Sequence, residues 1–339
     1  MTTTKKRPEV LVPAGTLEKL KVAVNYGADA VFVGGQAYGL RSRAGNFTMD
    51  ELREGIEYAH ARGVDVHVAS NMVTHEGNEK GAGEWFRELR DMGLDAVIVS
   101  DPALIEICST YAPGLNIHLS TQASATNVET FHFWKQYGLT RVVLAREVTM
   151  EELAEIRKRT DLEIEAFVHG AMCISYSGRC TLSNHMSDRD ANRGGCSQSC
   201  RWKYDLYDMP FGQERKSIHG EVPEEYSMSA VDMCMIENIP DLIDNGVDSL
   251  KIEGRMKRSE YVFAVTSAYR QAIDNFIMKH EPSISSLDMN YGALELDKVF
   301  NRDFTKGYIG QDKGSKIMNH KFQKYVGKPV AKVIEYDRD

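Results

Sequence analysis

Four of the six cysteines in this 339-residue chain lie close together, between positions 173 and 200. Cys173, Cys180, Cys196 and Cys200 have the spacing C-x6-C-x15-C-x3-C, and Cys234 follows further along the chain. Thiolates grouped in this way form disulfides, a zinc site or an iron–sulfur cluster. The alternative is that these thiols are simply buried and inert, but free cysteines are rarely grouped so closely.

The spacing bears on the choice between metals. Structural zinc sites usually contain cysteine pairs with about two to four residues between them, and only Cys196 and Cys200 meet that pattern. The wider gaps suit iron–sulfur ligation at least as well. Five cysteines therefore compete for four ligand positions, whereas Cys108 lies in an apolar helical pattern and is expected in the core.

The composition favours a cytoplasmic protein. Apolar residues make up 42% of the chain, but no run approaches the ~18 apolar residues of a membrane span. The N-terminus lacks the apolar segment of a signal peptide. Because disulfides are rare in the cytosol, the cysteines indicate a metal site or catalysis. A formal charge of −8 argues against nucleic-acid binding by bulk electrostatics, although a local basic patch is compatible with it.

The elements that must position these residues follow a repeated pattern. A similar phrase recurs as GADAVFVG (27–34), GLDAVIVS (93–100), GLTRVVLA (138–145) and GVDSLKIE (246–253). In each, a glycine suited to ending a helix precedes an apolar, strand-like run. The full pattern predicts strands near 9–13, 28–34, 64–70, 94–100, 115–120, 140–145, 162–168 and 247–253. It predicts helices near 17–26, 48–62, 79–92, 102–111, 127–137, 149–159, 232–245 and 259–278, with Thr16, Thr48 and Thr149 as N-caps.

This alternation predicts the α/β class and a (β/α)8 TIM barrel. A doubly wound sheet is less favoured, because no G-x-G-x-x-G follows the first strand. We expect the barrel to cover residues 1–280, with a Cys-rich insertion at about 171–231 after the seventh strand. A helical and loop extension is expected at 281–325, and 326–339 resembles the first strand of a truncated C-terminal β domain.

Polar side chains follow the predicted strands, at the end of the barrel where enzymes of this fold place their sites. Arginines there would bind a carboxylate or phosphate and so predict an anionic substrate, with mutual ion pairs as the alternative. His169 ends the seventh strand, where either a general base or a structural histidine would fit. We expect catalytic roles for His169, Arg146, Glu253 and Arg255, and substrate-binding roles for Arg41, Arg43, Asn71, Gln122 and Tyr176.

The segment EAFVHGAMCISYSGRCTLS (165–183) resembles the signature of the peptidase U32 family, E-x-F-x-x-G-[AS]-x-C-x(4,6)-G-x-C-x-[LIVM]-S. The segments NRGGCSQSCRWKY (192–204), SAVDMCMIENIP (229–240) and SLKIEGRMK (249–257) are similar to the same family. The similarity covers nearly the whole chain, and it is greatest to the branch that hydroxylates tRNA. Other branches hydroxylate ribosomal RNA or ubiquinone.

The resemblance implies a TIM barrel and a [4Fe–4S] cluster held by four cysteines. It also implies hydroxylation at C5 of the wobble uridine in the tRNA anticodon, with prephenate as the anionic co-substrate that supplies oxygen. By match to the family, Cys173, Cys180 and Cys196 are ligands, with Cys234 as the fourth in one branch and Cys200 in another. We favour Cys234, because its predicted helix directly follows the insertion and can fold back over it. Zinc is the alternative metal.

Within this interpretation, a flipped-out anticodon base would stack on an aromatic side chain such as Tyr176. Two other functions stay open. A peptidase is one, although the sequence contains neither H-E-x-x-H nor G-x-S-x-G. A non-catalytic scaffold, stabilised by its metal and presenting RNA or a protein, is the other.

Overall fold

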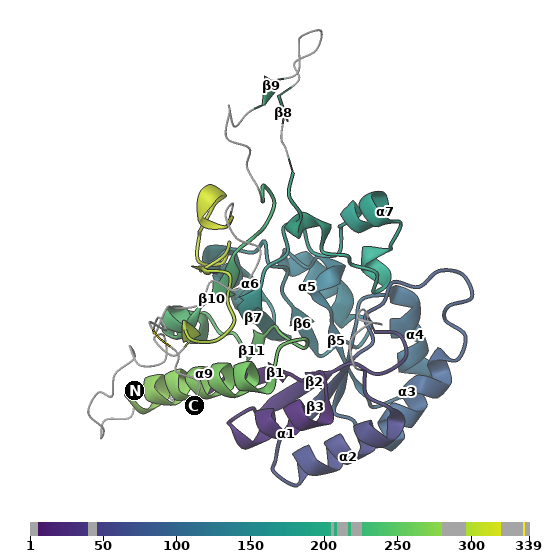
Figure 1. The fold of residues 1–339 in the computed structure, drawn as a ribbon. Coiled ribbons are helices and arrows are strands. Elements are labelled where there is room, and N and C mark those ends of the chain that lie inside the picture. The colour runs from purple at the N-terminus through teal and green to yellow at the C-terminus, as the bar shows by residue number, and fades with distance from the viewer. Residues whose placement is uncertain are drawn as a thin grey trace.

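The computed structural model of the chain describes residues 6–39, 46–204, 207–208, 216–217, 226–279, 296–319 and 335. Eight parallel strands form a closed barrel, in which the last strand pairs with both the first and the seventh (Figure 1). They are β1 (Glu9–Pro13), β2 (Ala30–Val33), β3 (Asp65–Ala69), β4 (Ala96–Val99), β5 (Asn116–Leu119), β6 (Arg141–Val143), β7 (Glu163–Ala171) and β11 (Ser249–Ile252). The predicted TIM barrel is confirmed, and each strand overlaps its predicted range.

Helices cover the outside of the barrel (Figure 1). They are α1 (Leu17–Asn25), α2 (Met49–His60), α3 (Ala82–Asp91), α4 (Pro102–Tyr111), α5 (Val128–Lys135), α6 (Met150–Arg159), α8 (Ile239–Asp244) and α9 (Ser259–Lys279). The side chains of Thr16, Thr48 and Thr149 each accept a hydrogen bond from the backbone three residues on, as N-caps should. The outward apolar side chains of the strands and the inner faces of the helices form the main core. Cys108 belongs to it and is fully buried, as predicted.

The barrel interior is charged toward the N-terminal ends of its strands. The guanidinium of Arg141 on β6 lies 2.7 Å from a carboxylate oxygen of Glu9 on β1 and 2.8 Å from one of Glu163 on β7. The Lys251 ammonium on β11 lies 2.5 Å from Glu165, whose side chain has no exposed surface. Buried charges are tolerated only when they are paired, so this network fixes β1, β6, β7 and β11 relative to one another.

A long insertion separates β7 from α8. It contains α7 (Leu182–Ser187), the 3-10 turns η2 (Ala191–Arg193) and η3 (Ser199–Arg201), and the two-residue strands β8 (Tyr207–Asp208) and β9 (Lys216–Ser217). β8 and β9 pair with each other and project away from the barrel (Figure 1). The chain then returns as β10 (Asp232–Cys234), which runs antiparallel to the end of β7.

The predicted helix at 232–245 is therefore partly wrong. Residues 232–234 are a strand, the turn η4 (Ile236–Asn238) follows, and only 239–244 are α-helical. Alternating apolar residues in so short a stretch fit a strand as well as a helix, and pairing with β7 decides between them. Residues 296–319 pack beside β10, because β12 (Phe304–Thr305) pairs with it and the turn η5 (Gly314–Lys316) follows. Apart from residue 335, the predicted strand at 326–339 lies outside the described residues.

Within the described part of the chain, no helix is both long enough and apolar enough to cross a membrane.

Candidate active site

A cavity of about 1040 Å³ lies at the C-terminal ends of the barrel strands. One wall comes from the insertion, and the others come from residues that follow β5, β6 and β11 and from segment 298–302. In a TIM barrel this end carries the active site, because the loops after the strands converge there. A volume of this size is at the upper end of the range of about 300–1,000 Å³ that is typical of small-molecule sites.

Four cysteines line this cavity: Cys173, Cys180, Cys196 and Cys200. The thiols of the first three are close enough to affect the pKa of Cys200 electrostatically, although burial is the main reason that this pKa is raised to about 11. Cys173 and Cys196 are exposed, and the other two are partly buried. The insertion thus brings together four thiols that are widely spaced in the sequence.

Cys234 lies apart from this group. It is the last residue of β10, opposite His169 of β7, and it does not line the cavity. Its thiol forms a hydrogen bond with the Tyr269 side chain of α9. The sequence favoured Cys234 because a predicted helix could fold back over the insertion, but residues 232–234 form a β-strand. The geometry therefore groups Cys200, not Cys234, with the other three cysteines.

The separation of the thiols bears on the kind of metal centre they could hold. Four sulfurs bound to zinc at about 2.3 Å in a tetrahedron lie about 3.8 Å from one another. Among the described residues, no three cysteine sulfurs lie within 4.8 Å of one another. An iron–sulfur cluster places iron and sulfide atoms between its ligands and so accepts wider spacing. As the side chains lie here, the thiols are therefore not arranged as the ligands of a single zinc ion.

The first part of the insertion is held tightly over the barrel. A Glu147 carboxylate oxygen after β6 accepts a hydrogen bond from the backbone N–H of Ser177 at 2.9 Å. The next residue, Gly178, has φ +69°, and a Cβ there would lie 2.0 Å from the carbonyl oxygen of Gln122. Only glycine fits this position, because both the backbone conformation and the space exclude a side chain. This contact sets the height of Cys173 and Cys180 above the barrel.

A buried arginine anchors the second part of the insertion. Arg201, next to Cys200, donates hydrogen bonds to the carbonyl oxygen of Met172 at 2.8 Å, to the Ser229 hydroxyl at 3.0 Å and to the Ala230 carbonyl oxygen. Burial lowers its pKa. Met172 precedes Cys173, so this side chain ties the two ends of the cysteine segment together. Arg201 therefore has a structural role beside the thiols.

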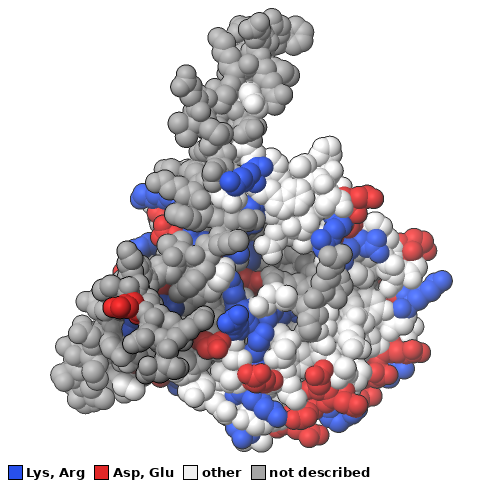
Figure 2. Space-filling model, in the orientation of Figure 1, with Lys and Arg blue, Asp and Glu red and all other residues white. Residues whose placement is uncertain are grey.

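Basic side chains dominate the charge of the cavity. Arg146, Arg189, Lys257 and Arg258 line it and, among the described residues, have no carboxylate within 4.0 Å. Lys and Arg gather near the centre of the face seen in Figure 2, whereas Asp and Glu are concentrated along its lower edge, over α1 and α2. A protein with net charge −8 thus carries a basic cavity at the C-terminal end of its barrel.

Two of these cations rest on aromatic rings. The guanidinium carbon of Arg146 lies 4.0 Å from the centroid of Phe167, and Nζ of Lys257 lies 3.1 Å from that of Phe300. Such contacts hold a cation without neutralising it. Burial is the main reason that the pKa of Lys257 is lowered to about 8. Lys257 therefore exchanges a proton near physiological pH and faces the cavity.

The other predicted catalytic residues differ in their placement. Glu253 lines the cavity. Arg255 does not; it is 6% exposed, and its guanidinium packs so closely on Gly34 that a Cβ there would lie 1.9 Å from Nη1. His169 is 2% exposed and is surrounded by the rings of Tyr261, Tyr269 and Phe304. Burial lowers the pKa of His169 to about 3, which favours the structural alternative for this histidine.

Three of the predicted substrate-binding residues, Asn71, Gln122 and Tyr176, lie around the mouth of the barrel. Gln122 and Tyr176 line the cavity, and Tyr176 is 68% exposed. Asn71 donates a hydrogen bond to the side-chain oxygen of Gln122 at 2.8 Å, so the two amides form one unit. Its own side-chain oxygen is buried without a hydrogen-bond partner among the described residues. Arg41 and Arg43 lie outside the described residues.

Sequence reasoning overlooked Lys257 and Arg189 as site residues. Lys257 ends the phrase SLKIEGRMK, so its position directly after the eighth strand was a usable signal. Arg189 has no such signal, because it enters the cavity only through the turn after α7, where Asp188 adopts φ +51°. Its place depends on the fold of the insertion.

Comparisons with known proteins agree with this architecture. The profile of peptidase family U32 matches residues 15–319. The chain is 47% identical over 336 residues to tRNA hydroxylation protein P1 of Bacillus subtilis (strain 168), covering 98% of this chain and 79% of that protein. It is 35% identical to tRNA hydroxylation protein P of Escherichia coli (strain K12), covering 93% and 77%. It is 34% identical to the 23S rRNA 5-hydroxycytidine C2501 synthase of the same organism, covering 100% and 50%.

Proposed function

The chain belongs to peptidase family U32, and we propose that it is an RNA-modifying enzyme that hydroxylates the wobble uridine of tRNA at C5. Relatives named for tRNA hydroxylation support this proposal, because they match almost the whole chain. The rRNA hydroxycytidine synthase supports the same reaction class on another pyrimidine. The observation that carries the proposal is the meeting of four thiols with Arg146, Arg189, Lys257 and Arg258 in one cavity at the catalytic end of the barrel.

We further propose that Cys173, Cys180, Cys196 and Cys200 hold a [4Fe–4S] cluster. Their wide spacing and their common cavity support this ligand set. Such a cluster supplies one-electron redox chemistry when it is bound. The chain itself contributes thiolates from a loop fixed by Gly178 and Arg201, and it leaves the Cys173 and Cys196 side of the site open to the cavity.

The cations of the cavity suit the two proposed substrates. Arg146 and Lys257 would bind the carboxylates of a small anionic co-substrate, for which we propose prephenate. Arg189 and Arg258 would bind phosphates of the anticodon loop, which position an RNA without reading its sequence. Exposed Tyr176 offers a ring on which a flipped-out base can stack. An enzyme acting on tRNA would work in the cytoplasm.

The peptidase and scaffold alternatives have less support. The sequence contains neither H-E-x-x-H nor G-x-S-x-G, and buried His169 is poorly placed as a general base. A scaffold would not need unpaired cations and exposed thiols facing one cavity.

The proposal is tested in a bacterial strain that lacks its own tRNA hydroxylation genes. Expression of this chain should restore 5-hydroxyuridine-derived nucleosides in purified tRNA, measured by mass spectrometry. Arg146→Ala should reduce the product while the purified protein stays folded and keeps its iron. Omission of prephenate biosynthesis in the host should abolish the product. A full level of product in a Cys173→Ala, Cys180→Ala double variant would rule out the cluster, and no product from the wild-type chain would reject the activity.

A further inference from the structure

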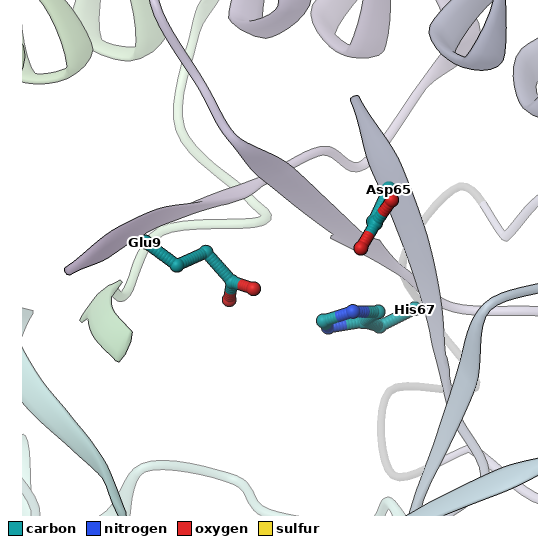
Figure 3. Close-up of side chains that lie close together, drawn as sticks. All are labelled: Glu9, Asp65 and His67. Carbon is teal, nitrogen blue, oxygen red and sulfur yellow. The ribbon is translucent and has the colours of Figure 1, made fainter. Parts of the chain in front are cut away.

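A second group of ligand-type side chains lies at the opposite end of the barrel, away from the cavity. Glu9 of β1 and Asp65 and His67 of β3 point toward one another across β2 (Figure 3). One side-chain ligand atom from each lies within 4.8 Å of those of the other two. Asp65 is exposed and Glu9 is partly exposed, so an ion can reach the group from solvent.

The histidine of this group has an unsatisfied nitrogen. His67 is 2% exposed, and its Nδ1 is buried without a hydrogen-bond partner among the described residues. Leaving a buried polar atom without a partner is costly, so this nitrogen points to a missing partner. A neutral imidazole has one ring nitrogen whose lone pair it can offer to a metal ion.

The surrounding charges favour a cation at this place. Arg141 and Lys251 are outnumbered by the carboxylates they contact, which belong to Glu9, Glu163 and Glu165. Asp65 adds a further carboxylate that, among the described residues, has no cationic side chain within 4.0 Å. Burial, followed by repulsion from Asp95 and Glu9, raises the pKa of Asp65. The N-terminal end of the barrel thus has an excess of negative charge.

Glu9 is held in position and still has capacity to bind. Its Oε1 accepts hydrogen bonds from Arg141 at 2.7 Å and from the Ser249 hydroxyl at 2.7 Å. Its Oε2 accepts one from Arg141 at 3.1 Å. Because each carboxylate oxygen has two lone pairs, Oε2 keeps one free. The arginine that neutralises part of its charge also fixes its orientation, and a fixed ligand loses little entropy on binding an ion.

We propose that Glu9, Asp65 and His67 bind a divalent metal ion at the N-terminal end of the barrel. One imidazole and two carboxylates suit Mn²⁺, Fe²⁺ or Zn²⁺, and water would complete the coordination. The ion would join β1 to β3 across the strand between them. Since this end of a TIM barrel contributes to stability and not to catalysis, the ion acts as a clamp on the fold. This inference does not depend on the proposed function.

Mn²⁺ is the probe of choice, because it prefers carboxylate ligands and avoids the thiols of the cavity. Free Mn²⁺ in a titration of the full chain is measured by electron paramagnetic resonance, and the thermal unfolding midpoint is recorded with and without the ion. The wild type should bind one Mn²⁺ per chain and unfold at a higher temperature when the ion is present. Asp65→Asn and His67→Gln should each lose that ion and the thermal shift.

Asp50→Asn, which removes an exposed carboxylate of α2, is the matched control and should bind as the wild type does. Asp65 is exposed, so its substitution tests the site even if His67→Gln does not fold. Wild-type protein that binds no Mn²⁺ would overturn the proposal. Binding that survives both substitutions would overturn it as well. Neither result would bear on RNA hydroxylation, which is assayed separately.

Discussion

Gly178→Ala is expected to inactivate the enzyme while leaving the barrel folded. The new Cβ would lie 2.0 Å from the carbonyl oxygen of Gln122, whereas real Cβ atoms essentially never come within 3.0 Å of another heavy atom. The insertion must therefore move by about 1 Å relative to β5, since Gln122 directly follows that strand. A misplacement of about 1 Å can cost roughly 10²-fold in rate when reacting groups must be aligned. We expect a loss of RNA hydroxylation of that order.

The chain offers a matched control for the backbone conformation. Gly63 has φ +70°, almost the same as the +69° of Gly178, but a Cβ there would meet nothing within 4 Å. Alanine in the left-handed region costs about 1–2 kcal/mol at either position. Both variants should therefore lose a similar amount of unfolding free energy, because the shift at Gly178 is confined to the insertion. Only Gly178→Ala should lose activity.

Three measurements separate these effects. Denaturant unfolding gives the free energy of each variant, iron and sulfide analysis after anaerobic purification gives the cluster content, and mass spectrometry of tRNA nucleosides gives the product. Gly63→Ala should keep iron and product near wild-type levels. Wild-type iron and product in Gly178→Ala would refute the reasoning that this glycine sets the position of the cysteines.

Three further predictions follow from the site and the barrel interior. Cys200→Ala should lose most of its iron and Cys234→Ala should keep it in anaerobic metal analysis; the reverse result would restore Cys234 as the fourth ligand. Because Lys257 is charged below its pKa of about 8, the KM for the proposed anionic co-substrate should rise as pH increases through 8, and Lys257→Arg should flatten that profile. Lys251→Met removes the cation that lies 2.5 Å from the fully buried carboxylate of Glu165. Breaking a buried ion pair costs ~3–5 kcal/mol, and Arg141 still lies 3.5 Å from this carboxylate. We therefore expect the free energy of unfolding, measured in urea, to fall by about 3 kcal/mol. A cost below about 1 kcal/mol would contradict that role.

The sequence by itself determined the barrel and the location of its site. Strand and helix periodicity follow directly from which residues are apolar, and the glycines that end helices mark the start of strands such as 30–33 and 96–99. The C-terminal end of each strand can also be predicted from the sequence. Arg146, Gln122 and Glu253 could therefore be placed at the catalytic end of the barrel before any contact was known. The order of residues in the chain was likewise enough to predict that cysteines cluster after β7.

Only the tertiary structure decided which of these residues share the cavity. Cys200 and Cys234 are both candidates for the fourth ligand from the sequence, but the pairing of β10 with β7 turns Cys234 toward Tyr269. His169 is buried because the aromatic residues of α9 and β12 cover it, and these lie at least 92 positions away in sequence, at Tyr261 and beyond. The close packing of Arg255 on Gly34 likewise joins residues that are far apart in the sequence.

The proposed metal site could likewise not be predicted from the local sequence. Glu9 and His67 are separated in the sequence by one strand, β2, and two helices, α1 and α2, and nothing in the local pattern of either residue indicates the other. They meet because β1, β2 and β3 are neighbours in a closed barrel whose strand register brings these side chains to one end. Local periodicity determines which elements form, whereas the register and closure of the sheet determine which distant side chains come into contact.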